Sequence, residues 1–385
     1  MLKPWCTLLF MLTMPSIAAP MLPEVNQVEE ARLPLAQQSM PEVVQRYQAF
    51  PEQLQQLLTL ANNELTLTQD TAALAKRLWQ QAVQDVQSGH PDDRALYWAR
   101  LAMRDTLLRT QAGFALAPWQ QKILLTSIEQ ASRGVSDVSF APQSQVRLLV
   151  TGFDPFFLDK HIDQSNPSGL AALMLDGHTF TINGQQAEIQ TLMIPVRFED
   201  FDRAMIEALL TPYFRDNSVD MVITVSMGRD NFDLERFVGR QRSAAAPDNR
   251  NILTGASHAH PQPPLFENAA IKGQSFYEFS LPATAMTQVS GPWAVQDNRQ
   301  VRTLEQGQIH ADALSPLLNQ TSVEGSGGGY LSNEITYRAL RIKDLLNSQV
   351  RSGHIHTPRV QGYDRERETA IVTQLTALIH AAAAQ

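Results

Sequence analysis

Two patterns of hydrophobic and polar residues divide this chain near residue 140. Before that point, apolar residues recur at four-residue spacing, as in Leu74, Leu78, Ala82 and Val86. Such spacing is typical of amphipathic helices. From Val146 onward, short apolar runs alternate with helical patterns, which is typical of an α/β domain with a mostly parallel sheet. We therefore expect a small all-helical domain over 46–140 and an α/β domain over 145–385.

The helical region carries three tryptophans, Trp79, Trp98 and Trp119. An aromatic residue at helical spacing usually packs in a core, so we expect all three inside the bundle. We find no recognisable chemistry in this region. The sequence leaves its role open between a lid, a docking module for a partner and a stabilising cap.

The α/β region contains several buried-type strand patterns, at 147–153, 187–196, 220–226, 321–325 and 352–358. Helical patterns fall around 168–175 and 199–214, after Ser332, and over 364–384. Residues 250–305 are rich in Pro, Asn, Gln and Ala, and we expect loops with short elements there. Ligands bind at the carboxyl ends of the strands in such sheets, so residues just after strands are the candidates for function.

The first residues have the pattern of a secretory signal peptide. Lys3 is followed by a short apolar core, and small residues then occupy the two positions that a signal peptidase reads, Ser16 and Ala18. We expect residues 1–18 to be removed and the protein to be exported to the periplasm or secreted. Polar residues 19–45 with scattered prolines predict a linker.

Composition narrows the possible partners. The net charge is −8, and no run of Lys and Arg exceeds two residues, so we expect no nucleic-acid or anionic-membrane partner. No apolar stretch is long enough to span a bilayer. The single cysteine, Cys6, lies in the predicted signal peptide, which leaves the mature chain without disulfides, thiolate metal sites or a cysteine nucleophile.

Two histidine pairs have a spacing that can ligate a metal. His354 and His356 are two residues apart, and His258 and His260 repeat that spacing. The sequence offers no evident third ligand, so we expect no metal site. We also expect no cofactor.

Three short motifs follow expected strands. The first is GFDPF at 152–156, with Asn166-Pro167-Ser168 after it. The second is FDLERFVGRQRSAAAPDN at 232–249. The third is SGGGYLSN at 326–333, followed by HIHTP at 354–358.

Together these motifs resemble those of pyroglutamyl peptidase I, the pyrrolidone-carboxylate peptidase family, from about Arg147 to Pro358. The resemblance does not cover the helical region. It implies a phosphorylase/hydrolase-like three-layer α/β fold. It also implies removal of an N-terminal pyroglutamyl residue from a small peptide by a Cys-His-Glu triad.

The resemblance assigns the site residues by position. The family's glutamate falls on Glu235, its histidine on His356 and its nucleophilic cysteine on Ser332. Ser332 would attack a carbonyl, His356 would carry the proton, and Glu235 would hold the imidazole. In the substrate-binding motifs, Phe153 and Phe156 would form an apolar wall, with Asn166 beside them.

Several positions depart from the family pattern. No counterpart of the lactam-binding Gln is found near residues 225–229, and Ala245 stands where the family has Arg. Phe157-Leu158 replaces a Gly-Gly pair. Ser332 would also be a good helix N-cap whether or not it reacts. The alternative to an active hydrolase is therefore an inactive relative that binds a peptide end, and the sequence leaves oligomerisation open.

Overall fold

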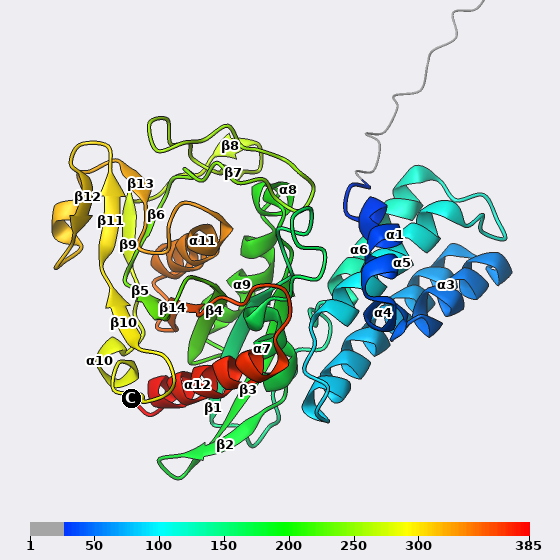
Figure 1. Cartoon of the computed structure of the whole chain (residues 1–385), viewed down its shortest axis with the longest axis horizontal. Coiled ribbons are helices and arrows are strands. Elements are labelled where there is room, and N and C mark those ends of the chain that lie inside the picture. The colour runs from blue at the N-terminus through cyan, green and yellow to red at the C-terminus, as the bar shows by residue number, and fades with distance from the viewer. Residues whose placement is uncertain (1–26) are drawn as a thin grey trace, which may run out of the picture.

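A computed structural model describes residues 27–385 of the chain. The predicted signal peptide, 1–18, lies outside the described residues. In Figure 1 a helical region, blue to cyan, lies beside an α/β region, green to red. Within 27–385, no helix has the length and apolar character needed to cross a membrane.

The α/β region is built on a seven-stranded sheet in the order β10-β5-β14-β4-β1-β3-β2. The four neighbouring strands β14, β4, β1 and β3 run parallel, whereas β2 is antiparallel to β3 and β5 is antiparallel to β14. The strands are β1 (Val146–Phe153), β2 (Thr179–Ile182), β3 (Gln185–Ile194), β4 (Met221–Met227), β5 (Phe232–Glu235), β10 (Val295–Asn298) and β14 (Arg351–Thr357). The mostly parallel α/β sheet is thus confirmed.

Helices cover both faces of this sheet. Side chains alternate along a strand, so Leu148 and Leu149 of β1 enter different hydrophobic clusters. Leu148 shares its cluster with α7 (Pro167–Leu175) and α12 (Arg365–Ala383). Leu149 shares the other with α9 (Met205–Asp216) and α11 (Leu331–Leu346), and α8 (Phe198–Asp202) precedes α9. The result is a three-layer arrangement.

Residues 237–324 form mostly short elements, as the composition of 250–305 predicts. They are β6 (Phe237–Gly239), β7 (Leu265–Phe266), β8 (Ala269–Ala270), β9 (Phe276–Glu278), α10 (Ala283–Met286), β11 (Gln300–Thr303), β12 (Gly307–His310), η2 (Ser315–Leu317) and β13 (Ser322–Glu324). β11 pairs with both β12 and β13, and β6 pairs with β9. β7 lies beside α8.

Four helices make up most of the N-terminal region: α3 (Ala49–Leu60), α4 (Glu64–Gln87), α5 (Arg94–Arg109) and α6 (Pro118–Ala131). Trp79 and Trp98 are fully buried, as expected. The expectation for Trp119 is wrong, because its side chain is 56% exposed. Trp119 lies in the first turn of α6, outside the buried stripe formed by Leu124, Leu125 and Ile128.

The expected linker over 19–45 is helical in its described part. It contains η1 (Glu30–Arg32), α1 (Leu33–Ser39) and α2 (Pro41–Gln45). Pro34 and Pro41 lie in the first turns of α1 and α2, where proline starts a helix without loss of a hydrogen bond. Glu29, Glu30 and Arg32 are buried, so this segment is part of the folded body.

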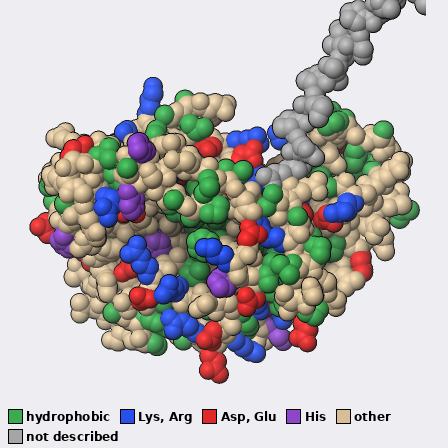
Figure 2. Space-filling model, turned by 45° about the horizontal axis from the view of Figure 1, so that its top comes forward, with side chains coloured by type: hydrophobic (Ala, Val, Ile, Leu, Met, Phe, Trp, Pro, Cys, Tyr) green, Lys and Arg blue, Asp and Glu red, His purple; other side chains and the backbone are tan. Residues whose placement is uncertain are grey.

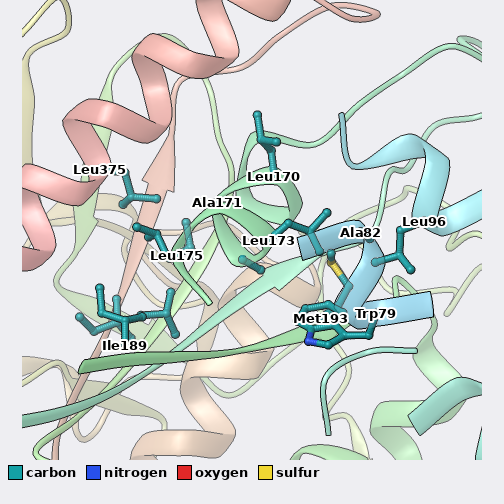
Figure 3. Close-up of a cluster of buried hydrophobic side chains, with 14 of the residues drawn as sticks. Trp79, Ala82, Leu96, Leu170, Ala171, Leu173, Leu175, Ile189, Met193 and Leu375 are labelled. Atoms are coloured by element: carbon teal, nitrogen blue, oxygen red, sulfur yellow. The ribbon is translucent and has the colours of Figure 1, made fainter. Parts of the chain in front are cut away.

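The helical and α/β regions share one hydrophobic core. Figure 3 shows Trp79 and Ala82 of α4 and Leu96 of α5 packed close to Leu173 of α7 and Met193 of β3. Farther along the same cluster lie Ile189 and Leu375. Because α7 lies on the sheet, the helical region covers the outside of the α7 layer and does not form a separate body.

Buried ion pairs join the two regions at the end of β1. Asp154, in the GFDPF motif, accepts a hydrogen bond from Arg100 of α5 at 2.9 Å and pairs with Arg133 at 2.7 Å. Nearby, Arg197 pairs with Glu29 at 2.6 Å and with Glu129 at 2.9 Å. Neighbouring arginines hold the pKa values of the Glu29 and Glu129 carboxyls below their ordinary value even though burial, the largest influence, opposes this.

Candidate active site

Two of the predicted site residues meet between neighbouring strands. Glu235 ends β5, and His356 lies on β14, which pairs antiparallel with β5. The distance from His356 Nδ1 to Glu235 Oε1 is 2.5 Å, and both side chains are buried. A carboxylate can only accept, so Nδ1 carries the hydrogen and donates it. The Nε2 atom is then the acceptor nitrogen and has no hydrogen-bond partner within residues 27–385.

A third residue, which the sequence did not reveal, forms the second hydrogen bond to the Glu235 carboxylate. Asn298 ends β10, directly opposite Glu235 in the parallel β10–β5 pairing. Its Nδ2 donates to Glu235 Oε2 at 3.0 Å and to the Ser326 carbonyl at 2.9 Å. Both carboxylate oxygens of Glu235 are therefore engaged, one by the imidazole and one by the amide.

The glycine-rich turn at 325–329 lies over the His356–Glu235 pair and is held there by hydrogen bonds. The Ser326 side chain accepts from the Phe237 amide at 2.8 Å and donates to the Phe237 carbonyl at 2.9 Å. A Cβ placed on Gly327 would lie 3.3 Å from His356 Cε1 and 3.4 Å from Glu235 Cγ. The turn can approach the catalytic pair so closely because residue 327 has no side chain.

Ser332 lies in the first turn of α11, five residues after Gly327. Its hydroxyl donates to the Gly327 carbonyl at 3.4 Å, a long hydrogen bond, and the residue is only partly buried. The cap interpretation of Ser332 is wrong, because Tyr330 is the N-cap residue and the helix has no side-chain cap. Ser332 thus contacts the turn that lies over the His356–Glu235 pair, and within residues 27–385 its side chain makes no hydrogen bond to either of those two residues.

The start of α11 leaves polar hydrogens available near Ser332. The first N–H groups of an α-helix have no intrahelical acceptor, and the helix dipole makes this end favourable for negative charge. Asn333 fixes the helix start, because its Oδ1 accepts from the Gly239 amide at 2.9 Å and its Nδ2 donates to the Gly239 carbonyl at 2.7 Å. Such fixed donors suit an oxyanion that forms next to the Ser332 hydroxyl.

The first histidine of HIHTP, His354, has a structural role. His354 is fully buried, with Nδ1 2.8 Å from Thr224 Oγ1 and Nε2 2.7 Å from Ser226 Oγ. Burial, and to a smaller extent His356, lowers the pKa of His354 well below its ordinary value, so it is neutral. In the other pair, His258 contacts Glu324 at 2.9 Å. Among residues 27–385, no three His, Cys, Asp or Glu side chains are grouped to hold a metal ion.

Of the residues predicted to bind substrate, two are buried in other roles. Phe153 is 3% exposed and stacks on Phe201 within the core. Asn166 caps α7, with Oδ1 accepting from the Ser168 amide and Nδ2 donating to the Asp154 carbonyl. Since both polar atoms of the Asn166 side chain are engaged and the residue is fully buried, it offers nothing to a substrate.

Phe156 is the one predicted substrate residue that stays partly accessible. Its ring lies 4.5 Å from that of Phe157, which is 42% exposed. Phe157 has a φ of +62°, a conformation that glycine adopts readily and a bulky residue rarely does. The residue that replaces the first glycine of the family motif has thus kept a glycine-type backbone conformation and added an exposed ring.

The charged side chains on one face of the molecule are mixed in sign. Figure 2 shows Lys and Arg side chains interspersed with Asp and Glu on the face that it views, with several histidines among them. This face therefore has no broad field of one sign of the kind that binds nucleic acid.

The fold and these contacts define an α/β protein with a buried, hydrogen-bonded His356–Glu235 pair at one side of its sheet. The chain belongs to the PA0049 family: the family of the PA0049 C-terminal domain matches residues 147–299 and 290–361, and that of the PA0049 N-terminal domain matches residues 15–129.

Its relatives include an uncharacterized protein and several peptidases. The chain is 28% identical to PA0049 of Pseudomonas aeruginosa over 355 residues, which cover 71% of this chain and 64% of that protein. It is also 28% identical to the pyrrolidone-carboxylate peptidase of Streptococcus pneumoniae strain 70585 over 213 residues, 55% of this chain and 78% of the peptidase. The α/β region is therefore homologous to pyrrolidone-carboxylate peptidases.

Among solved structures, a mutant pyrrolidone carboxyl peptidase from the hyperthermophile Pyrococcus furiosus matches at 20% identity with a TM-score of 0.43. The match covers 62% of this chain and 98% of that one.

Proposed function

We propose that this protein is a hydrolase that cleaves an amide bond next to an N-terminal pyroglutamyl-type residue. The observation that carries the proposal is the His356–Glu235 hydrogen bond beneath the turn that leads to Ser332. Homology to pyrrolidone-carboxylate peptidases supports the reaction class. The partly accessible Phe156 supplies an apolar surface for a small ring.

The reaction would proceed in two steps. Ser332 Oγ attacks the scissile carbonyl while His356 Nε2 removes its proton, and the first N–H groups of α11 stabilise the oxyanion. His356 then protonates the leaving amine, which departs and leaves an acyl-serine. A water molecule, deprotonated by His356, hydrolyses the ester and restores the Ser332 hydroxyl. Glu235 keeps Nδ1 protonated and stabilises the imidazolium in both steps.

The direct test is hydrolysis of a pyroglutamyl amide with a fluorescent leaving amine. We expect the wild-type protein to turn it over, and Ser332→Ala to lower kcat at least roughly a thousandfold. Ser136→Ala, an exposed serine of the helical region, is the matched control and should leave the rate unchanged. Unchanged turnover in Ser332→Ala would rule out the proposed nucleophile.

A second variant distinguishes low reactivity of the Ser332 hydroxyl from loss of the substrate pocket. Ser332→Cys introduces the nucleophile type of the resembled family, which is intrinsically stronger than a hydroxyl. Activity that appears only in Ser332→Cys would mean that the natural protein is the binding relative, with an intact but silent site. Ala245, exposed where the resembled family has an arginine, is the observation that favours this second candidate.

We further propose that the protein acts outside the cytoplasm, after cleavage of residues 1–18. The motivation is the pattern of Lys3, an apolar core and small residues before Ala18. N-terminal sequencing of the protein recovered from cell fractions tests this. A full-length chain in the cytoplasmic fraction would contradict it.

A further inference from the structure

A polar cavity of about 300 Å³ adjoins the His356–Glu235 pair. Its walls come from the loop before β5, from β10 and β11, and from the turn at 325–328. Asn298 and Ser326, which hold Glu235 in place, both line it. So does Asp233, the residue of β5 that pairs with His356 across the strands. His356 and Glu235 do not line the cavity themselves, but three of their direct neighbours do.

Most charges in this cavity are already paired. Arg302 contacts Glu324 at 3.2 Å, and Asp230 lies 3.8 Å from Arg359. Asp233 and Arg229 line the cavity as well, and neither side chain has a hydrogen bond or ion pair within residues 27–385; Arg229 is exposed, whereas Asp233 is half-buried. Burial, and then the neighbouring Glu235, raise the pKa of Asp233 to about 6, while His356 and Arg229 act in the opposite direction. At pH 7.5 Asp233 is therefore mainly an ionised carboxylate without a direct partner, with Arg229 as a second charged group of the same cavity.

The proposed reaction places the leaving group next to this carboxylate. His356 must donate a proton to the leaving amine, so that nitrogen lies within hydrogen-bond distance of the imidazole. The residue attached to it then extends from His356, and the cavity beside Asp233 is open to receive it. A volume of about 300 Å³ is at the lower end of the range for ligand pockets and is sufficient for one long side chain.

We propose that this cavity binds the residue that follows the scissile amide, and that Asp233 selects a lysine or arginine side chain there. The proposal rests on the proposed function. Asp233 attracts the cationic head, and the polar rim formed by Gln296, Gln300 and Gln308 supplies amide oxygens that can accept its remaining hydrogens. An acidic side chain at the same position would face Asp233 and Glu235 together, and like charges at close range repel.

A binding experiment tests the cavity without any need for turnover. The wild-type protein is titrated with the free dipeptides Lys-Ala, Gln-Ala and Glu-Ala, and binding is followed by NMR at pH 7.5. We expect Lys-Ala to bind roughly tenfold more tightly than Gln-Ala, since a charged hydrogen bond is worth more than a neutral one. Glu-Ala should bind most weakly.

Two substitutions decide whether Asp233 is responsible. Asp233→Asn should make the affinities for Lys-Ala and Gln-Ala equal. Asp312→Asn changes a carboxylate with a 96% exposed side chain outside the cavity and should leave the preference intact. Equal affinities in the wild type, or a lysine preference that survives in Asp233→Asn, would overturn the proposal.

Turnover then separates this proposal from the proposed function. With pyroglutamyl-Lys and pyroglutamyl-Gln amides, we expect kcat/KM to favour the lysine substrate by roughly the same tenfold factor. Equal kcat/KM values would contradict the cavity proposal and leave the hydrolase proposal standing. Hydrolysis of neither substrate would contradict the hydrolase proposal, while the dipeptide titration would still decide what the cavity binds.

Discussion

Asn298 is the residue whose importance becomes visible only in the folded chain. It lies 63 residues from Glu235 in sequence, in a region with no regular pattern, yet its amide spans Glu235 Oε2 and the Ser326 carbonyl. We regard it as a positioning residue, because it acts on the histidine through Glu235. Nothing in the polar stretch around it distinguishes Asn298 from its neighbours, so sequence reasoning had no signal to use.

The first prediction concerns this amide. Asn298→Ala should lower kcat by roughly tenfold to a hundredfold, because Glu235 loses one of its two fixed contacts. Asn298→Asp has the same size but cannot donate, and it places a second carboxylate against Glu235, so its loss should be greater. The measurement is kcat and KM on a pyroglutamyl amide. A KM effect alone would show that Asn298 binds substrate and does not position Glu235. Asn62→Ala, at an exposed position in the helical region, serves as the control.

Asn166 and Phe153 match motifs that predict substrate binding, but their contacts in the structure are those of a helix cap and a core residue. Asn166-Pro167-Ser168 is also an N-cap followed by a proline at the first helical position, a combination that starts helices in general. This general pattern already predicts from the sequence that Asn166 is the N-cap of a helix. Phe153 ends a buried strand, and its burial follows from the same alternation that places Leu149 in the core.

At the scale of elements, the main strands of the sheet could be predicted from the sequence. The strands that were expected from apolar runs are central or well covered, so their sequences carry a strong hydrophobic signal. β10 is different, because it is an edge strand of four residues, none of them fully buried, and its sequence VQDN has no apolar run. The side of the site that holds Glu235 is built from this strand, which explains why only part of the site could be foreseen.

The second prediction concerns the turn between β13 and α11. Gly327→Ala would place a methyl group 3.3 Å from His356 Cε1 and 3.4 Å from Glu235 Cγ, which is closer than most such contacts. We expect the turn to shift by a few tenths of an ångström and kcat to fall roughly tenfold, with little change in thermal stability.

Gly184→Ala is the reciprocal control. Gly184 has a φ of +78° in the hairpin between β2 and β3, with nothing within 4 Å of an added Cβ. This substitution should lower the free energy of unfolding by about 1 kcal/mol and leave kcat unchanged. If Gly327→Ala keeps full activity, the turn does not constrain the catalytic pair.

At the scale of the whole molecule, buried ion pairs join the helical region to the end of β1, where the GFDPF motif lies. The third prediction uses Asp154, which is paired with Arg100 and Arg133. Asp154→Ala leaves the buried Arg100 without a carboxylate partner, whereas Arg133 keeps Glu129, and should cost roughly 3 kcal/mol of unfolding free energy. Arg109→Ala breaks an exposed ion pair with Asp105 and should not change the melting temperature. Chemical denaturation of both variants measures the contrast, and similar stabilities would contradict the role given to the buried pairs.

The fourth prediction concerns pH. Burial raises the pKa of the Glu368 carboxyl to about 7, although a hydrogen bond from Ser165 opposes this. Between about pH 4.5 and 7 the folded chain keeps a proton that the unfolded chain releases, so stability falls as pH rises through this window. The free energy at stake is on the order of 1–3 kcal/mol. Melting temperatures measured across this range should decline less steeply in Glu368→Gln than in the wild type, since Asp93, Asp176 and Asp233 also have raised pKa values and remain in the variant. Parallel curves would exclude Glu368 as a cause.

The contacts of the first described residues have a consequence for the order in which the chain can fold during synthesis. Glu29 binds Arg197, 168 positions later, and Arg32 donates to the Asn249 carbonyl, 217 positions later. At ~5–20 residues per second, a ribosome needs roughly 10–40 s to supply these partners. The segment that is made first can therefore close onto the body only after Arg197 and Asn249 have been made. Burial of Glu29 and Arg32 would then mark the completion of folding, although both residues are among the earliest to be translated.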